Sequence, residues 1–166
     1  MFCVSDSCEF SLDPNTAHRR LLLSEDNQTV TCVKEEEEYP DHDDRFTDYC
    51  LQVLSCTGLR GRCYWEVDWN WRVSIAVSFR GIRRSGRQSG FGYNDLSWSL
   101  GRVLWQSGLG VFLDSEAGAL SFYDVSSDGE LFHLWTFSWS FSEPVFSGFR
   151  PVEEGSSVTL VKETMN

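Results

Sequence analysis

Two carboxylates at alternate positions of one predicted strand are the first candidates for catalysis. Glu66 and Asp68 are separated by one residue, so both side chains lie on the same face of an extended strand. Such a pair could supply the nucleophile and the acid of a retaining glycosidase, which lie about 5–5.5 Å apart. The E-x-D-x-x-E pattern of that chemistry has a third acid, but position 71 is Trp71. We therefore interpret the pair as an outward-facing acidic strand.

No other catalytic pattern is present in the sequence. The G-x-S-x-G, G-x-G-x-x-G, Walker A and H-E-x-x-H motifs are absent, and no histidine has a Ser or Cys nearby in a recognisable nucleophile context. The sequence therefore predicts a protein that is not an enzyme, with no cofactor and no small-molecule substrate.

The cysteines are concentrated in the first part of the chain, at Cys3, Cys8, Cys32, Cys50, Cys56 and Cys63. None forms a C-x-x-C pair and the three histidines are scattered, so no metal site is predicted. The first residues also lack the basic-then-apolar order of a signal peptide. We therefore expect six reduced thiols and a cytoplasmic location. Asn27 begins an N-x-T glycosylation pattern, which matters only if the protein is secreted.

The formal net charge of -11 disfavours polyanionic partners. We expect no binding to nucleic acid, and no apolar stretch is long enough to predict a membrane span. A basic run interrupts the acidic chain on a Gly-containing connection, at Arg80, Arg83, Arg84 and Arg87. Four guanidinium groups suit recognition of carboxylates on a protein partner. A solvated loop and a phosphate site are the alternatives.

Two aromatic residues beside predicted loops are further candidates for partner contacts. Trp98 lies at a predicted loop rim, and Phe141 lies just before Pro144, which keeps its segment out of a central strand. Aromatic residues at loop edges are enriched in binding hot spots, but they are also common in cores. Both interpretations stay open for Trp98 and Phe141.

The elements that must position these residues are strands, because apolar residues alternate in short runs and no helical period extends over ten residues. The clearest run is Val73–Phe79, in which large residues face one layer and small residues face the other. The predicted strands are 21–24, 30–33, 63–69, 73–79, 109–114, 119–125, 131–137 and 156–161. Half-apolar strands of this kind predict two antiparallel sheets packed face to face.

Several motifs, in order, resemble the PRY/SPRY (B30.2) family. They are L-D-P-N-T-A at 12–17, Y-P at 39–40 with R-F at 45–46, G-R-C-Y-W-E-V at 61–67, W-S-L at 98–100, G-V-F-L-D at 110–114 and A-G-A-L-S-F-Y at 117–123. The nearest likeness is to domains of tripartite-motif proteins, fish NLR-type receptors and stonefish-type cytolysins.

This resemblance implies an all-β, concanavalin-like antiparallel β-sandwich. It divides the chain into an N-terminal tail (1–7), a PRY segment (8–60), an SPRY segment (61–161) and a C-terminal tail (162–166). The implied function is a non-catalytic protein–protein interaction module of an innate-immune or ubiquitin-pathway protein, in which the loops around Trp98 and Phe141 contact the partner. The alternatives are the C-terminal domain of a secreted pore-forming toxin-like protein and a glycan-binding β-sandwich.

The chain departs from the family between residues 100 and 110, where the segment is much shorter. Val103, Leu104 and Trp105 are too few to replace a strand and a loop. We therefore expect an unpaired sheet edge, an incompletely covered core, reduced stability and self-association through that edge.

Overall fold

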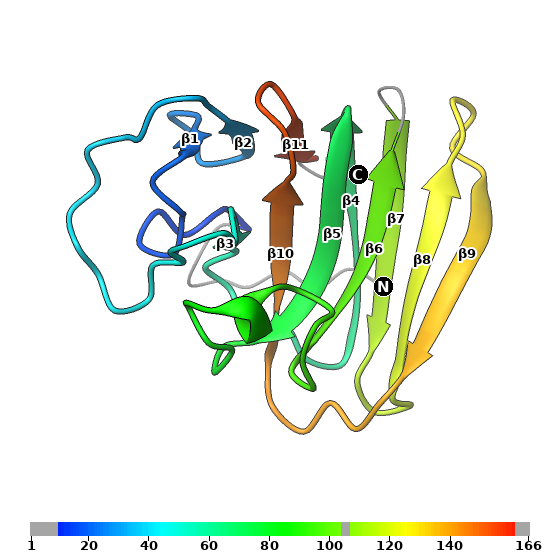
Figure 1. Cartoon of the computed structure of the whole chain (residues 1–166). Helices are drawn as coiled ribbons and strands as arrows, with labels where there is room; N and C mark the ends of the chain where they lie inside the picture. The colour runs from blue at the N-terminus through cyan, green and yellow to red at the C-terminus, as the bar shows by residue number, and fades with distance from the viewer. Residues whose placement is uncertain (1–9, 104–106, 162–166) are drawn as a thin grey trace.

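The structure is a computed structural model that describes residues 10–103 and 107–161. Almost all of its regular elements are β-strands (Figure 1). In chain order they are β1 (Leu21–Leu23), β2 (Thr29–Cys32), β3 (Val53–Leu54), β4 (Arg62–Asn70), β5 (Arg72–Phe79), the 3-10 helix η1 (Arg87–Ser89), β6 (Ser97–Val103), β7 (Ser107–Asp114), β8 (Ala119–Val125), β9 (Leu131–Ser138), β10 (Val145–Pro151) and β11 (Ser157–Leu160). The tails proposed at 1–7 and 162–166, and the residues Leu104 and Trp105, lie outside the described residues.

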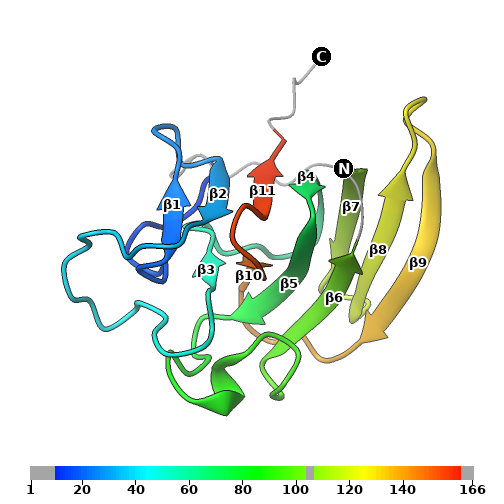
Figure 2. The ribbon, with the colours of Figure 1, turned by 45° about the horizontal axis from the view of Figure 1, so that its top comes forward.

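Two antiparallel sheets form the sandwich predicted from the sequence. The first has seven strands in the order β1-β2-β11-β4-β7-β8-β9, and the second has four in the order β3-β10-β5-β6. Figures 1 and 2 show the smaller sheet lying across the larger one. Strands from the PRY and SPRY segments share both sheets, because β11 pairs with β2 and β10 pairs with β3. The two segments therefore build one common core.

Alternation along the strands separates the core from the surface. In β4, Trp65, Val67 and Trp69 are all buried, while Tyr64 and Glu66 lie on the other face and are only partly buried. The large residues of β5 join the same core cluster. β5 also lies between β10 and β6, which confirms its predicted interior position.

Three strands were not among those predicted from alternation: β3, β6 and β10. The most informative is β10, which is central although it contains Gly148 and ends at Pro151. A Cβ atom at Gly148 would lie 2.6 Å from Cζ of Phe91, so the glycine lets a buried ring pack directly on the backbone of the sheet. The sequence around Gly148 has low strand propensity. The glycine is required at this position because Phe91, from a loop distant in the sequence, packs against it.

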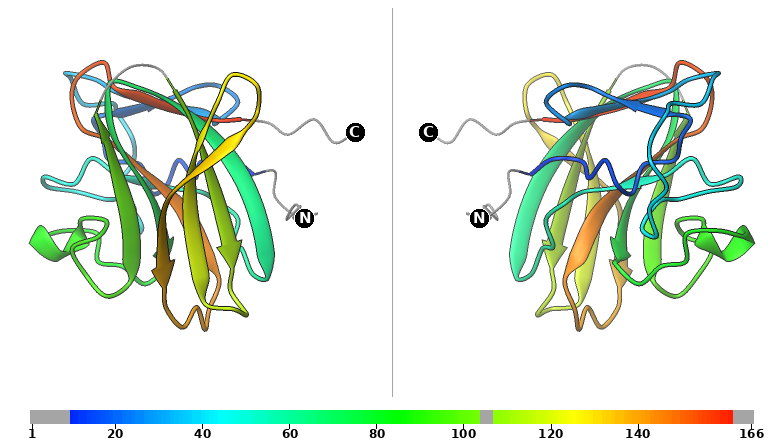
Figure 3. Two further views of the ribbon diagram at one scale, coloured as in Figure 1. Left: turned by 90° about the vertical axis from the view of Figure 1, so that its right-hand side faces the viewer. Right: turned by 90° about the vertical axis from the view of Figure 1, so that its left-hand side faces the viewer.

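The sandwich is open on the side of β6 and β9. Within residues 10–103 and 107–161, each of these strands has a paired neighbour on one side only. Figure 3 shows β9 at the open side of the seven-stranded sheet, across from β6. Trp135 and Phe132 of β9 are 56% and 55% exposed. Within the described residues, β6 is therefore an end strand of the smaller sheet, and part of β9 is not covered by it.

Candidate protein-binding surface

Most of the residues proposed to bind a partner lie at one end of the sandwich. We call this region the loop end: the connection from β5 to β6 (residues 80–96) with η1, the start of β6, and the connection from β9 to β10 (residues 139–144). Figures 1 and 2 show these segments at the same end of the strands. The topology brings them together because β5 and β9 both end there, and β6 and β10 both begin there.

Arg80 and Arg84 are held by contacts within the domain. The Arg80 Nη2 atom donates to Asp13 at 3.2 Å and to Asp44 at 2.9 Å, and its guanidinium lies over the ring of Phe146. Arg84 donates to the carbonyl oxygen of Arg80 at 2.8 Å. Burial lowers the pKa of the Arg84 guanidinium, and the nearby positive charge of Arg80 lowers it further. These two arginines fasten the loop to the PRY segment.

Arg83 and Arg87 are exposed and point the charge of the basic run into solvent. The φ angle of Gly86 is 83°, a conformation that other residues adopt only at a cost, and its N–H donates to Asp48 at 3.1 Å. The loop conformation is thus fixed by backbone geometry. Arg83 and Arg87 remain free to meet carboxylates of a partner.

Trp98 and Phe141 pack against each other inside an aromatic cluster. Their ring centroids are 4.9 Å apart, and Phe79 and Trp139 contact Trp98 at 5.5 and 5.9 Å. Trp98 is 9% exposed and Phe141 is 7% exposed, whereas Trp139 is 48% exposed. The accessible member of the cluster is therefore Trp139, which sequence reasoning did not single out. The sequence offered one signal for Trp139: it lies two residues before Phe141, which had been proposed as a contact residue.

A shallow groove runs beside this cluster at the loop end. Its volume is about 240 Å³, and it is lined by the connection from β5 to β6, the start of β6 and the end of β9 with the residue after it: Gly92, Asn94, Asp95, Ser97, Trp98, Ser99, Phe137 and Trp139. The side chain of Asn94 holds the wall in place by donating to the carbonyl oxygens of Gln88 and Gly90. The groove offers aromatic surface and a few polar atoms, a composition typical of a peptide-binding or protein-binding surface.

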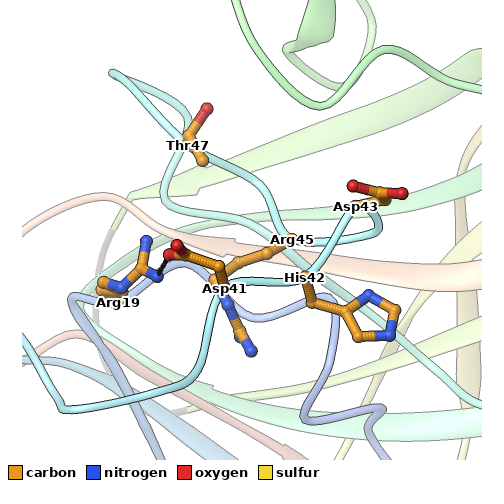
Figure 4. A pocket seen from close by; sticks show the side chains of 6 residues that line it. All are labelled: Arg19, Asp41, His42, Asp43, Arg45 and Thr47. Carbon is orange, nitrogen blue, oxygen red and sulfur yellow. Dashed lines mark hydrogen bonds and ion pairs between the residues drawn. The ribbon is translucent and has the colours of Figure 1, made fainter.

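A second hollow lies between the residues before β1 and the connection from β2 to β3 (Figure 4). The carboxylate of Asp41 forms an ion pair with Arg19, and the six labelled side chains do not converge on one point. Arg45 is buried and donates to the carbonyl oxygens of Pro14, Ala17 and Pro40 at 2.8–3.1 Å. Arg45 therefore stabilises the loop, and the acidic run around Asp41 is its solvated surface.

The two carboxylates on β4, Glu66 and Asp68, lie on the outer face of the sheet. The hydroxyl of Tyr64 donates to Glu66 at 2.8 Å. Partial burial raises the pKa of Asp68, and the negative charge of Glu66 raises it further. Position 71 turns the chain with a φ of 77°, and the indole N–H of Trp71 donates to Glu153. No third carboxylate is provided by this part of β4.

The expectation of six reduced thiols is wrong. Cys32, Cys50 and Cys63 are buried and form no disulfide, whereas Cys56 is disulfide-bonded. The sequence pattern failed because spacing cannot reveal a pairing that only the fold brings about. Within the described part of the chain, no three His, Cys, Asp or Glu side chains are grouped to hold a metal ion.

The fold and the loop end define a class of protein: a β-sandwich domain that presents loops at one end. Comparison with known proteins then identifies the family. Residues 10–59 match PRY, the SPRY-associated domain. The chain is 35% identical to stonustoxin subunit alpha of Synanceia horrida over 93% of its own length, and 38% identical to tripartite motif-containing protein 14 of Mus musculus over 84%. Residues 10–59 therefore belong to the PRY family, and the chain over most of its length is similar to PRY/SPRY (B30.2) proteins.

Solved structures show the same architecture. The stonustoxin structure aligns with 93% of the chain at a TM-score of 0.84 and 31% identity. The TRIM65 PSpry domain aligns with 93% of the chain and 90% of its own length, at a TM-score of 0.78 and 24% identity. The chain spans only 25% of stonustoxin subunit alpha and 37% of tripartite motif-containing protein 14. No described helix is long and apolar enough to cross a membrane.

Proposed function

We propose that the chain is a non-catalytic recognition domain that binds a protein through its loop end. The observation that carries this proposal is the junction of exposed Trp139, the groove beside it and exposed Arg83 and Arg87 at one end of the sandwich. Aromatic residues and arginines dominate the energy of protein interfaces. The family likeness supports the same role.

Within this surface, we assign different roles to the residues proposed from the sequence. Arg83 and Arg87 contact acidic groups of the partner, together with Trp139. Arg80 and Arg84 hold the loop, and Trp98 and Phe141 support Trp139 from below. The likeness to tripartite-motif proteins supports a place in an innate-immune or ubiquitin-pathway protein and a cytoplasmic location. We also propose the division into a PRY segment at 8–60 and an SPRY segment at 61–161.

Two steps test the loop end. Proximity labelling or cross-linking of the full-length protein identifies the partner, and the affinity for the purified partner is then measured. The variant Arg83→Glu/Arg87→Glu/Trp139→Ser should weaken binding by about tenfold or more, because it reverses two charges and removes one aromatic anchor. Tyr49→Ser is the matched control, since Tyr49 is 84% exposed in the PRY segment. Equal loss in both variants, or undiminished binding by the triple variant, contradicts the proposed surface.

A second candidate function is a domain of a secreted, toxin-like protein. The disulfide at Cys56 favours it, because disulfides persist in oxidising compartments. The similarity to stonustoxin agrees with this reading. Alkylation of the denatured native protein without reductant distinguishes the two: a protected Cys56 beside reactive Cys32, Cys50 and Cys63 supports secretion, and a reactive Cys56 supports the cytoplasm.

A further inference from the structure

The open side of the sandwich exposes aromatic residues that belong to the core face. Trp135 pairs across β8 and β9 with Phe122, which is fully buried, so both side chains lie on the same face of the sheet. A register shift between Phe122 and Tyr123 follows, after which Phe132 pairs with Asp124, two residues along β8 from Phe122, and so lies on the same face. Yet Trp135 and Phe132 are more than half exposed. A residue on the inner face of a sandwich is exposed only where the opposite sheet ends.

The opposite sheet ends at β6. Beyond β6, the four-stranded sheet has no further strand among the described residues, and the outward backbone groups of β6 have no strand to pair with. A strand added there would lie about 4.8 Å from β6 and about 10 Å from the facing sheet. Its inward side chains would then cover the exposed faces of Trp135 and Phe132. We call this space between β6 and β9 the edge slot.

The strands that border the edge slot are joined by contacts at the loop end. At the loop end, Trp98 of β6 contacts Trp139 just after β9, and the groove described above joins the two strands. At the other end of β9, Phe132 is the second residue of the strand and follows the connection from β8 to β9. An extended segment of a few residues fits this shape, because a strand rises about 3.3 Å per residue.

The charge around the slot indicates what kind of segment fits. Arg102 lies on β6 near its end, but the stretch from Val103 to Phe149 contains no Lys or Arg and carries six acidic residues: Asp114, Glu116, Asp124, Asp128, Glu130 and Glu143. Asp128 and Glu130 are exposed on the connection into β9, and Asp124 lies opposite Phe132. Positive charges at the ends of a bound segment would be attracted to this region.

We propose that the edge slot binds an extended, apolar segment with basic flanks from a partner protein, by addition of a strand to β6. Backbone hydrogen bonds to β6 supply affinity, and alternate apolar side chains on Trp135 and Phe132 supply selectivity. A second copy of the chain fits less well, because it carries the same charge of -11 and the same acidic stretch. This surface is distinct from Arg83, Arg87 and the exposed face of Trp139.

A labelled synthetic peptide of about twelve residues, with alternating Val and Thr between pairs of Lys, serves as the probe. Fluorescence anisotropy should show binding that weakens as salt is raised. Hydrogen exchange should slow at the amides of β6 in the complex. The same peptide with Pro at alternate positions should not bind, since Pro cannot donate to the sheet, and a peptide with Glu flanks should bind at least several-fold more weakly.

Three variants locate the site. Phe132→Ser/Trp135→Ser should reduce affinity by about tenfold or more, and Asp128→Asn/Glu130→Gln should reduce it several-fold and flatten its salt dependence. Tyr49→Ser should leave it unchanged. All four altered residues of the first two variants are exposed, and circular dichroism verifies that each variant is folded. Because the peptide assay does not use the loop-end variant, its result is independent of the proposed loop-end function.

Three outcomes would overturn the proposal. Equal binding of the Pro-containing peptide would show apolar adhesion without strand addition, and unchanged exchange at β6 would place the peptide elsewhere. Light scattering that shows a dimer, abolished by Phe132→Ser/Trp135→Ser, would identify a second copy as the occupant and restore the self-association expected from the sequence.

Discussion

At the scale of single residues, His18 shows how a buried side chain makes this fold sensitive to pH. The backbone N–H of Arg20 donates to Nδ1 of His18 at 3.0 Å, so Nδ1 carries no proton. Nε2 then donates to the carbonyl oxygen of Asp48 at 3.0 Å. Both ring nitrogens are used by the neutral imidazole, and a second proton on Nδ1 would break the bond from Arg20. His18 thereby ties β1 to the loop around Asp48.

We predict that acidification destabilises the protein through His18. Burial lowers the pKa of His18 below the value of about 6.5 that it has in the unfolded chain. The unfolded state therefore binds more protons as the pH falls below 6.5, and stability is lost until the pH reaches the lowered pKa. Each kcal/mol lost should reduce Tm by about 2–4 °C in a chain of this size.

His18→Gln provides the test, because Gln can accept and donate but does not titrate. Thermal unfolding followed by circular dichroism between pH 7.5 and 5 should show a flatter decline of Tm in the variant than in the native protein, whatever the absolute Tm. His133→Gln is the control, since His133 is exposed on β9. An unchanged slope in His18→Gln would assign the pH dependence to other groups.

At the scale of elements, most of the strands could be predicted because their residues alternate strictly. β4, β5, β7 and β8 carry their core residues at period two, whereas β9 has apolar residues at 131, 132, 134, 135 and 137 and a register shift against β8. β10 could not be predicted, because Gly148 is required by the packing of Phe91, a residue 57 positions earlier in the chain. The loop-end residues were only partly predictable. The run of charges identifies Arg80–Arg87, but the sequence does not show that Arg80 is held by ion pairs with Asp13 and Asp44.

We predict that Gly148→Ala destabilises the domain by about 1–3 kcal/mol, the usual cost of overpacking a core. The new Cβ would lie 2.6 Å from Cζ and 2.9 Å from Cε2 of Phe91, whose ring is 2% exposed and packs edge-on against Phe46. The ring has no free space into which to move. Chemical denaturation of the purified variant measures the change.

Two further variants make this prediction specific. Gly101→Ala, on β6 of the same sheet, meets only the Oγ of Ser74 at 4.0 Å and should cost far less. Phe91→Leu combined with Gly148→Ala should recover part of the loss, because the smaller side chain leaves room for the methyl group. Additive losses in the double variant would mean that the two residues do not interact.

At the scale of the whole molecule, the two sheets have unequal reach. The seven-stranded sheet extends to β9, whereas the four-stranded sheet stops at β6. Leu120 and Phe122 of β8 are 0% exposed, whereas Phe132 and Trp135 of β9 are 55% and 56% exposed. The core therefore ends within β9, where Leu134 and Phe137 still pack against it.

We predict that a longer segment between Leu100 and Gly110, of the kind found in relatives, stabilises the chain and closes the edge slot. Covering the exposed halves of Trp135 and Phe132 removes apolar surface from water, at about 25 cal/mol per Å², and pairs the backbone of β6. Ordering the added loop opposes this gain, but closure entropy grows only slowly with loop length. The grafted chain should therefore have the higher Tm.

The grafted chain should also no longer bind the basic, apolar peptide, because its own strand occupies the site. Any concentration-dependent association seen by light scattering should disappear. A flexible Gly-Ser graft of the same length is the control, since it lengthens the connection without supplying a strand. Equal Tm values for the native, grafted and Gly-Ser chains would show that the open edge costs the fold nothing.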